Sequence, residues 1–322
     1  MKKKPNLVIY YQLIEPIFEA IRELDNIREH YQVSWATEDY IHKGTFAYIV
    51  ALLEGSISET AERFLVAFPE KLPKAKLEYE RHKNDFLTAN FSHDVIKVLA
   101  QEYIAEFSYQ GFEQQIEKFC TLFGIDNLSK DFGKSLKEKK ARRNILIHNN
   151  LKIDSSYIRA TGCDPDRKGD YCLISQEYVL ESISDVRQLL EKFQIQLGAR
   201  YQSYTILKAV KDVWAYVFDS PLLAFDDYWG VTEDGTSLNI KGDALRKQYS
   251  HLSSGEKTLL FYFLQNYSTN VMEIIGGPTV LNMQISNNEK MVFLVSVFDR
   301  FPLLLQNLNS IEVYNKNRYI KS

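Results

Sequence analysis

The sequence predicts a mainly α-helical protein, in which a helical bundle over residues 1–200 is followed by a smaller, mostly helical region over residues 201–322. Three observations support this prediction. Apolar residues recur at intervals of three and four through most of the chain, as on the buried face of an amphipathic helix. Glycine, proline or asparagine stands where these periodic segments stop. No internal repeat or low-complexity segment interrupts the pattern.

Composition narrows the class of protein. A chain of 322 residues is long enough for two ordinary domains, and 45% hydrophobic with 25% charged residues is typical of a globular protein. Because the net charge is -3, any binding of a polyanion must come from a local basic patch. Cys120, Cys163 and Cys172 have no CxxC spacing, which argues against a disulfide framework and a zinc site and favours a reducing compartment.

The N-terminal sequence predicts neither a signal peptide nor a membrane span. Met1–Pro5 resembles the basic start of a signal peptide, but Gln12, Glu15 and Pro16 break the apolar run that follows. No uninterrupted apolar stretch reaches the roughly 18 residues that a membrane span needs. We therefore expect a cytoplasmic protein, and the sequence offers no sign of a metal or other cofactor.

The first region begins with four predicted helices. Pro16 is expected to bend or interrupt the first, Ser92 to Asp94 can cap the third, and Gly124 stops the fourth. The charged segment Lys74–Leu87 is either a short exposed helix or an ordered loop. The predicted helices span Leu7–Val33, Phe46–Phe68, His93–Phe107 and Phe112–Phe123.

A basic helix is predicted next, from Lys130 to His148. Between Ser129 and Arg143, seven basic residues stand against two acidic ones, a net charge of +5 in a chain whose total is -3. Asn149 and Asn150 should end this helix, because asparagine tolerates the left-handed conformation found at helix C-termini.

The chain after the basic helix is predicted from turn and cap residues. A turn-rich loop covers Thr161–Asp170, and a short extended piece covers Tyr171–Ile174. A long helix from Gln176 to about Ala199 follows, with Ser175 as its cap. In the second region we expect helices near Tyr204–Phe218, Gly255–Tyr267 and Glu289–Leu308. The aromatic stretch Asp219–Gly230 either recognises a partner or substrate or covers the core.

Arg143 and His148, at the end of the basic helix, suit the cleavage of RNA. The ribose 2′-oxygen must lose a proton to attack the phosphate, and the 5′-oxygen must gain one on leaving; a histidine serves in either role. A guanidinium beside it can bind the phosphate and stabilise the charge of the transition state. The two residues lie roughly 140° apart around the helix, so we expect a symmetric dimer to assemble the site from two copies.

The segment Arg143 to His148, followed by Asn149, Asn150 and Ile153-Asp154-x-x-Tyr157, resembles the HEPN superfamily. The resemblance covers roughly residues 1–200 and implies a helical bundle, usually dimeric. Many members are metal-independent endoribonucleases in toxin–antitoxin, abortive-infection and CRISPR defence systems. In one subgroup a tyrosine two residues after the histidine is modified by an antitoxin; here that residue is Asn150, so regulation of that kind is not expected.

The resemblance also assigns roles. It implies that His148 is catalytic, that Arg143 binds or activates the phosphate, and that Asn144 supports their geometry. Glu54, within an apolar helix, either orients Arg143 or lies on the helix surface. The predicted substrate-binding residues are Arg142, Lys139, Lys140, Asn149 and Glu54.

Other motifs have simpler readings. Gly133-Lys134-Ser135 resembles the end of a phosphate-binding loop, but Leu128 replaces the glycine that such a loop needs. Ser253 to Glu256 resembles an ATPase signature, but fits a capping box better. Asp164, Asp166 and Asp170 lack the closing glutamate of a calcium loop and predict a turn.

Two functional hypotheses lead. The first is a cytoplasmic homodimeric endoribonuclease with RNA as substrate and a possible antitoxin or defence partner. The second is a non-catalytic module that binds RNA or a nucleotide, or assembles with a partner. A purely structural scaffold is the third, and it predicts that charge reversal along Lys134–Arg143 changes no RNA association.

Overall fold

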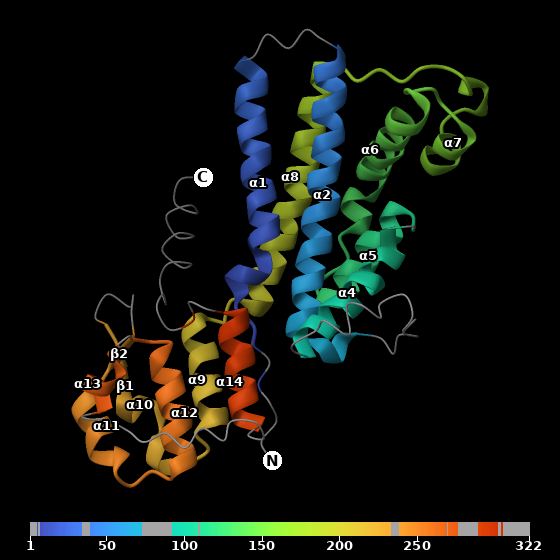
Figure 1. Cartoon of the computed structure of the whole chain (residues 1–322). Coiled ribbons are helices and arrows are strands. Elements are labelled where there is room, and N and C mark those ends of the chain that lie inside the picture. The colour runs from blue at the N-terminus through green and yellow to red at the C-terminus, as the bar shows by residue number, and fades with distance from the viewer. Residues whose placement is uncertain are drawn as a thin grey trace. The chain divides into compact units, whose positions relative to one another are not determined.

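A computed structural model describes residues 5, 7–33, 39–72, 92–108, 110–232, 238–268, 270–275, 289–301 and 304 (Figure 1). The chain divides into two compact units. We call Gln12–Gln202 the long-helix unit, and Met1–Tyr11 with Ser203–Ser322 the aromatic unit. The boundary after Gln202 lies next to the predicted one after residue 200, but the described residues near the N-terminus group with the aromatic unit. The predicted segment Lys74–Leu87 lies outside the described residues.

The described part of the long-helix unit consists mainly of α-helices. Two single 3₁₀ turns, Pro69–Lys71 and Pro165–Arg167, lie in its connecting segments. Its α-helices are α1 (Tyr10–Val33), α2 (Asp39–Ala67), α4 (Ser92–Ser108), α5 (Phe112–Phe123), α6 (Ser129–Asn149), α7 (Ser155–Thr161) and α8 (Gln176–Tyr201).

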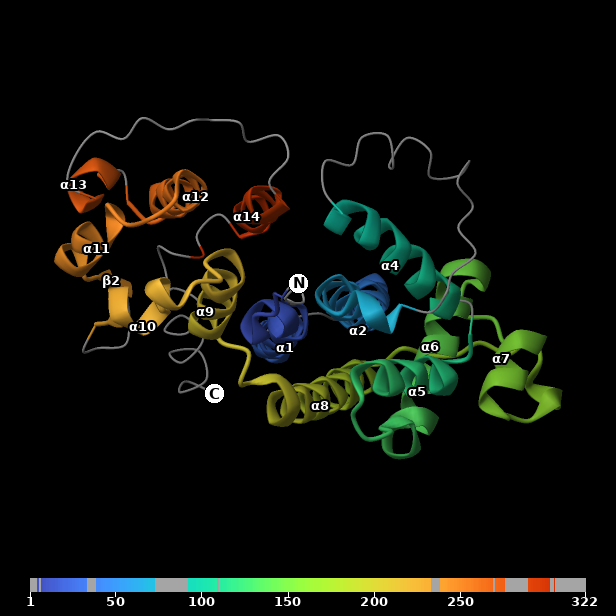
Figure 2. The same ribbon diagram turned by 90° about the horizontal axis from the view of Figure 1, so that it is seen from below.

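Helix α2 lies at the middle of this unit. It packs against α4, α5, α6 and α8, and Figure 2 shows α1 on one side of it and α4 and α6 on the other. Aromatic rings fill the contact: Phe64 of α2 meets Phe123 of α5 edge-on at 5.3 Å between centroids. Phe193 of α8 meets the same Phe123 at 6.1 Å. The helix bearing Glu54 also packs directly against α6, the helix bearing Arg143 and His148.

Most predicted helix ends in this unit are confirmed, and one start is wrong. Gly124 (φ 66°) and Asn150 (φ 45°) both adopt the left-handed conformation that ends α5 and α6. The hydroxyl of Ser175 accepts a hydrogen bond from Tyr178 N and caps α8. The second helix starts at Asp39 rather than Phe46, because Gly44 continues the helix instead of preceding it. Pro16 lies inside α1.

The aromatic unit contains short helices and one small hairpin. The strands β1 (Trp229–Val231) and β2 (Leu238–Ile240) pair antiparallel, with Gly230 opposite Asn239. A 3₁₀ turn covers Pro221–Leu223. The helices are α9 (Ile206–Val217), α10 (Phe225–Tyr228), α11 (Gly242–Tyr249), α12 (Ser254–Gln265), α13 (Val271–Ile275) and α14 (Glu289–Arg300). The hairpin, α11 and α13 were not predicted from the sequence.

The segment Asp219–Gly230 covers part of the core of the aromatic unit, one of its two predicted roles, and its recognition of a partner or substrate stays a prediction. Trp214 of α9 donates its indole N–H to the carbonyl of Leu223 at 2.6 Å. Trp229 is 2% exposed, and its ring meets that of Trp214 edge-on. Ser253 and Glu256 form the predicted capping box at the start of α12. Within the described residues, no helix is long and apolar enough to cross a membrane.

Candidate functional site

The C-terminal end of α6 presents His148 to solvent. Asn150 ends the helix by donating its backbone N–H to the carbonyl of Ile145. Asn149 donates its side-chain amide to the carbonyl of Lys152 at 2.7 Å, so the predicted substrate contact instead holds the turn together. In the part of the chain that the structure describes, the exposed His148 ring has no hydrogen-bond or ion-pair partner.

Arg143 is held on both sides. Its Nη2 lies 2.9 Å from Oε2 of Glu54, a residue of α2, and its Nη1 donates to Oδ1 of Asn144 at 3.1 Å. The structure thus brings Glu54 and Arg143 together, as the orienting role requires. Glu54 is not a free residue on the helix surface.

A second cation shares the same carboxylate. Nζ of Lys140 lies 3.0 Å from Oε1 of Glu54 and donates to Oε1 of Gln115 at 2.9 Å. One carboxylate therefore faces two cations, and the three side chains keep a net charge of +1. These groups are a sixth to a quarter exposed, so the remaining charge is only partly screened and suits an anionic ligand.

The basic face of α6 is largely neutralised within the unit. Of the seven basic residues counted in the sequence, Lys130 and Lys134 are exposed and have no ion-pair partner among the described residues. The other five are paired with carboxylates at 4 Å or less: Lys137 with Glu113, Lys139 with Asp185, Lys140 with Glu54, Arg142 with Glu138, and Arg143 with Glu54. The helix is not an open cationic surface, contrary to what its composition indicates.

Lys139 is buried rather than available to a substrate. Its side chain is 3% exposed, and its ammonium lies 2.7 Å from Asp185 and 3.1 Å from Glu181 on α8. It also donates to the hydroxyl of Ser135 at 2.9 Å. Lys139 therefore joins α6 to α8, and we do not retain it as a substrate contact.

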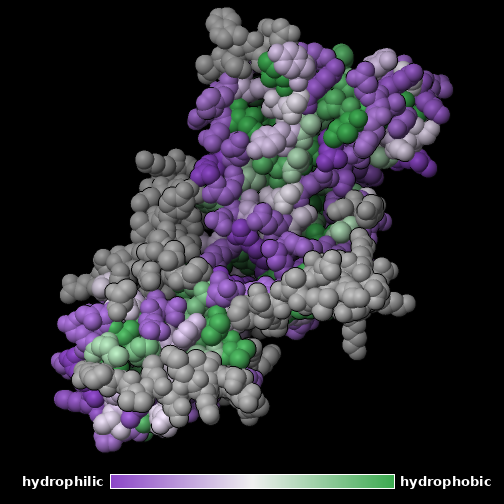
Figure 3. Space-filling model, viewed as in Figure 1, coloured by the Kyte–Doolittle hydropathy of each residue, from purple (hydrophilic) through white to green (hydrophobic). Residues whose placement is uncertain are grey.

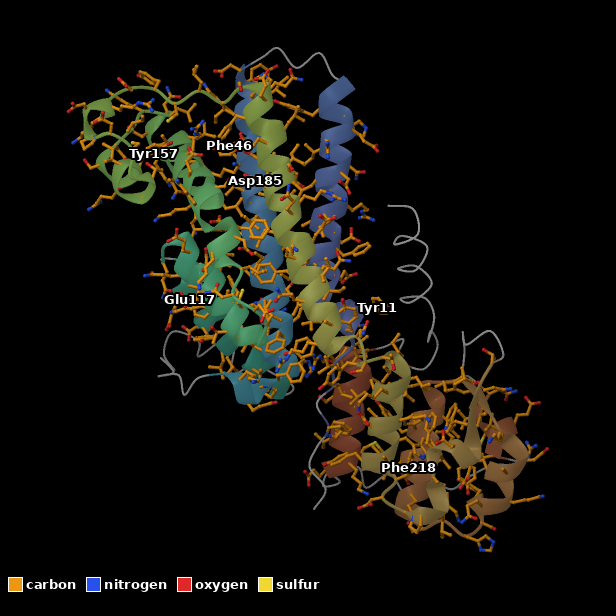
Figure 4. The ribbon with its side chains drawn as sticks, turned by 180° about the vertical axis from the view of Figure 1, so that it is seen from behind. Tyr11, Phe46, Glu117, Tyr157, Asp185 and Phe218 are labelled. Atoms are coloured by element: carbon orange, nitrogen blue, oxygen red, sulfur yellow. The ribbon has the colours of Figure 1, made fainter. Side chains whose placement is uncertain are left out.

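Arg142 also belongs to the interior. Its Nε lies 2.7 Å from Oε1 of Glu138, and its guanidinium lies 4.0 Å from the centre of the Tyr178 ring. Glu138 accepts hydrogen bonds from the hydroxyls of Tyr157 at 2.6 Å and Tyr178 at 2.5 Å. Nη1 of Arg142 donates to the carbonyl of Leu173. This polar cluster ties α6 to α7, α8 and the extended segment between them. Figure 4 labels Tyr157, its member on α7.

The ionisation of this cluster is strongly fixed. Burial raises the pKa of Tyr178, and the negative charge of Glu138 raises it further. The pKa of Tyr157 is raised by burial and by its hydrogen bond to Glu138. For Arg142, burial lowers the pKa, but its acidic and phenolic neighbours outweigh that effect and the net pKa is raised. At neutral pH the guanidinium is therefore charged and both phenols are neutral.

The loop after α7 is a turn region, as predicted for Thr161–Asp170. Asp154 caps α7 by accepting from Tyr157 N at 2.8 Å, and Asp164 accepts from Asp166 N at 3.0 Å. Lys152 and Tyr171 then pair in an antiparallel bridge. Across the described residues, no group of three His, Cys, Asp or Glu side chains is arranged to hold a metal ion.

A groove of about 560 Å³ lies on another face of the long-helix unit, between α1 and α2. Charged residues line much of it, among them Glu15, Glu59 and Arg63, and Arg63 pairs with both glutamates. Figure 3 shows mainly hydrophilic residues across the middle of this face. The groove includes neither Arg143 nor His148.

The structure therefore brings some predicted site residues together and separates others. Glu54, Lys140, Arg143 and Asn144 form one connected group, while His148 lies exposed beyond it on the same helix. The residues that sequence reasoning missed are the anchors of α6, namely Gln115, Glu138, Tyr178 and Asp185. Of the other residues in this network, only Tyr157 could be singled out from the sequence, because it belongs to the segment after His148 that carries the family resemblance. Comparison with known proteins gives no match to any family model, curated protein or solved structure.

Proposed function

We propose that this protein is a HEPN-type endoribonuclease whose long-helix unit carries the active site. The observation that carries the proposal is an exposed His148 in the last turn of α6, five residues after an Arg143 that Glu54 holds in place. An oriented guanidinium and a solvent-accessible imidazole are the two groups that cleavage at a ribose 2′-oxygen needs. The resemblance of this segment to HEPN proteins supports the same assignment.

The proposed chemistry balances without a redox step. His148 accepts the proton of the 2′-hydroxyl as that oxygen bonds to phosphorus and the bond to the 5′-oxygen breaks. A second imidazole donates a proton to the departing 5′-oxygen, leaving a 2′,3′-cyclic phosphate. Arg143 stabilises the additional negative charge on the phosphate oxygens, with Asn144 and Glu54 restricting its rotation.

Two copies of the chain are part of this proposal. One α6 supplies one histidine, and the five-residue offset turns His148 roughly 140° away from Arg143. A twofold axis near the end of α6 would place two imidazoles and two guanidinia in one site. The toxin-like or anti-phage role, with an antitoxin or defence partner, follows only from the family resemblance.

The decisive experiment incubates purified protein with labelled RNA in the absence of added metal. We expect a 2′,3′-cyclic phosphate product from the wild type and its loss by at least about 100-fold in His148→Ala, since acid–base catalysis contributes about that much or more. His251, an exposed histidine of the aromatic unit, gives the matched control His251→Ala, which should cleave normally. Undiminished cleavage by His148→Ala would sink the proposal.

The second candidate is a module that binds RNA or a nucleotide without cleaving it. The pairing of five of the seven basic residues of α6 inside the unit favours this alternative, because it leaves little free charge for a long RNA. Salt-dependent binding with no product in the same assay would establish it.

A further inference from the structure

A small surface beside His148 is fixed by the fold but unused by the proposed chemistry. It consists of the outward side chains of Lys152, Tyr171 and Leu173, which we call the bridge face. Lys152 and Tyr171 pair directly in the antiparallel bridge, and Cys172 N donates to the carbonyl of Leu151 at 2.9 Å. Since side chains alternate along extended strands, these three residues share one side.

Burial follows the same alternation. The inward residues Leu151, Ile153, Cys172 and Ile174 are all 6% exposed or less. On the outward side, Tyr171 is 62% exposed and Leu173 is 80% exposed. An exposed tyrosine and an exposed leucine on the outward side of one bridge form an apolar surface that the described part of the chain leaves uncovered.

The bridge face is held rigidly from beneath. Arg142 donates to the carbonyl of Leu173, and Glu138 fixes Arg142 from the other side. At the opposite strand, Lys152 N donates to the carbonyl of Asn149 at 2.9 Å, and the Asn149 amide donates back to the Lys152 carbonyl. These bonds begin one residue after His148. A rigid surface loses little conformational freedom when it binds a ligand.

The bridge face also offers a free cation. Among the described residues, the ammonium of Lys152 has no ion-pair partner and the Tyr171 hydroxyl has no hydrogen bond. The stem of Lys152 passes over Gly169, where an added Cβ would lie 3.8 Å from its Cε. Gly169 has φ +99°, a conformation that favours glycine. A cation beside an exposed aromatic ring is the combination that binds single-stranded nucleic acid, through phosphate and base stacking.

We propose that the bridge face binds the nucleotide next to the scissile phosphate in single-stranded RNA. The base stacks on Tyr171 and packs against Leu173, while Lys152 contacts a flanking phosphate. The inference rests on the proposed function and adds a substrate class to it. A duplex would be a poor substrate, because its bases are already stacked and cannot reach Tyr171.

A second copy of the chain is a weaker occupant for the bridge face. Three side chains expose on the order of 400 Å², about half of what one partner contributes to a stable interface. Lysine is also depleted at protein–protein interfaces, and Lys152 is one of the three residues of the bridge face. Both points favour a nucleic acid.

The test measures binding of a fluorescent single-stranded RNA carrying 2′-O-methyl groups, which cannot be cleaved, together with the same sequence as a duplex. We expect Tyr171→Ala to weaken single-strand binding about 5- to 100-fold and to leave duplex binding unchanged. Tyr171→Phe, which keeps the ring, should bind within about twofold of wild type. Tyr40→Ala, at another exposed tyrosine, is the matched control.

The lysine contact is tested by salt dependence. Lys152→Ala should reduce the slope of log affinity against log salt by about 0.7, the value for one phosphate contact on a single strand. Lys192→Ala, at an exposed lysine of α8, should leave the slope unchanged. Wild-type protein that binds no single-stranded RNA, or a Tyr171→Ala variant that binds it normally, overturns the inference.

Sedimentation tests the remaining possibility, that the bridge face is a contact between two copies of the chain. If Leu173→Ser and Tyr171→Ala convert a dimer to monomers, the bridge face is a contact between copies and the inference is wrong. Cleavage by wild type that Tyr171→Ala leaves unaffected refutes this inference alone. Tyr171-dependent binding without any cleavage refutes the proposed function alone.

Discussion

The two units differ in what lies inside them. All five of the described polar or charged residues that are buried belong to the long-helix unit: Ser56, Thr60, Gln115, Lys139 and Ser182. The described core of the aromatic unit is apolar, with Trp214, Trp229 and Phe263 packed edge to face at its centre. One unit buries polar and charged side chains, whereas the described core of the other is formed almost entirely by apolar and aromatic ones.

This difference bears on the candidate site, because the side chains of the site must be held in fixed positions. Burying a charge costs free energy unless it is paired, and even a paired charge contributes less than a well-packed apolar group. What it adds is direction, because an ion pair is satisfied in few arrangements. In the long-helix unit, the buried and half-buried pairs surround α6 and keep Arg143, His148 and the bridge face in fixed places. The aromatic unit shows no comparable cluster in its described residues.

The largest expected effect is on the apolar core. Phe263 is fully buried and contacts both tryptophans, so Phe263→Ala should destabilise the aromatic unit by about 3–5 kcal/mol. Tryptophan fluorescence during urea unfolding measures this loss of stability, since Trp214 and Trp229 line the cavity that the substitution would leave. A loss below about 1 kcal/mol would show that the core repacks around the smaller side chain. The cores of the two units would then differ less than we propose.

Lys139 tests the polar interior. Lys139→Ala leaves Asp185 without its cation, and we expect a loss of about 2–3 kcal/mol, below the range for a fully buried pair because both carboxylates are partly exposed. Circular dichroism during urea unfolding measures it. Lys139→Met restores the packing without the charge and serves as the matched variant. If the methionine variant is as stable as wild type, the pair contributes direction and no net stability.

Glu54 links the interior to the site. Glu54→Gln keeps the shape but weakens the contacts with Arg143 and Lys140, and we expect kcat for RNA cleavage to fall about 10- to 100-fold with little change in KM. Glu181→Gln, at a more exposed glutamate that also pairs with a lysine, is the control. An effect confined to KM would mean that Glu54 affects substrate binding and not the chemical step.

Tyr178 gives the polar cluster a pH dependence. Burial and Glu138 hold the pKa of Tyr178 above its ordinary value of about 10. The stability from this group is complete below that value. Above it, the unfolded chain releases the phenolic proton and the folded chain keeps it, so stability falls as the pH rises.

Tyr178→Phe should remove this dependence. Between about pH 10 and 11, we expect the free energy of unfolding of the wild type to fall faster than that of the variant, by up to about 1.4 kcal/mol per pH unit. Urea unfolding at a series of pH values measures both slopes, with Tyr40→Phe as an exposed control. Equal slopes for wild type and Tyr178→Phe would contradict the role given to the cluster.

The smallest expected effect concerns a helix cap. Ser253 caps α12 by accepting from Glu256 N, and Ser253→Ala should destabilise the aromatic unit by about 1 kcal/mol. Urea unfolding followed by tryptophan fluorescence measures it. RNA cleavage should be unchanged. Reduced cleavage at an unchanged folded fraction would show that the aromatic unit contributes to the site, and would narrow the functional contrast between the units.

The helices could be predicted because their signals are local. Gly124, Asn150 and Ser175 each mark a helix end through their own backbone preference or side-chain hydrogen bond. The start of α2 was missed because glycine is unfavourable inside a helix, yet Gly44 lies within the first two turns of α2. The small hairpin was missed because strands of three residues carry too few alternating positions. The extended piece at Tyr171–Ile174 was predicted, but its pairing with Lys152 was not.

The candidate site likewise depends partly on local sequence and partly on tertiary contacts. The sequence determined that an arginine and a histidine stand at the end of a basic helix, and that asparagines end that helix after the histidine. Only the tertiary structure decided that Glu54 faces Arg143 across 89 positions of the chain, and that Lys139 turns inward to Asp185. Helical periodicity depends on residues three and four apart, whereas ion-pair partners depend on how packed helices are rotated against one another.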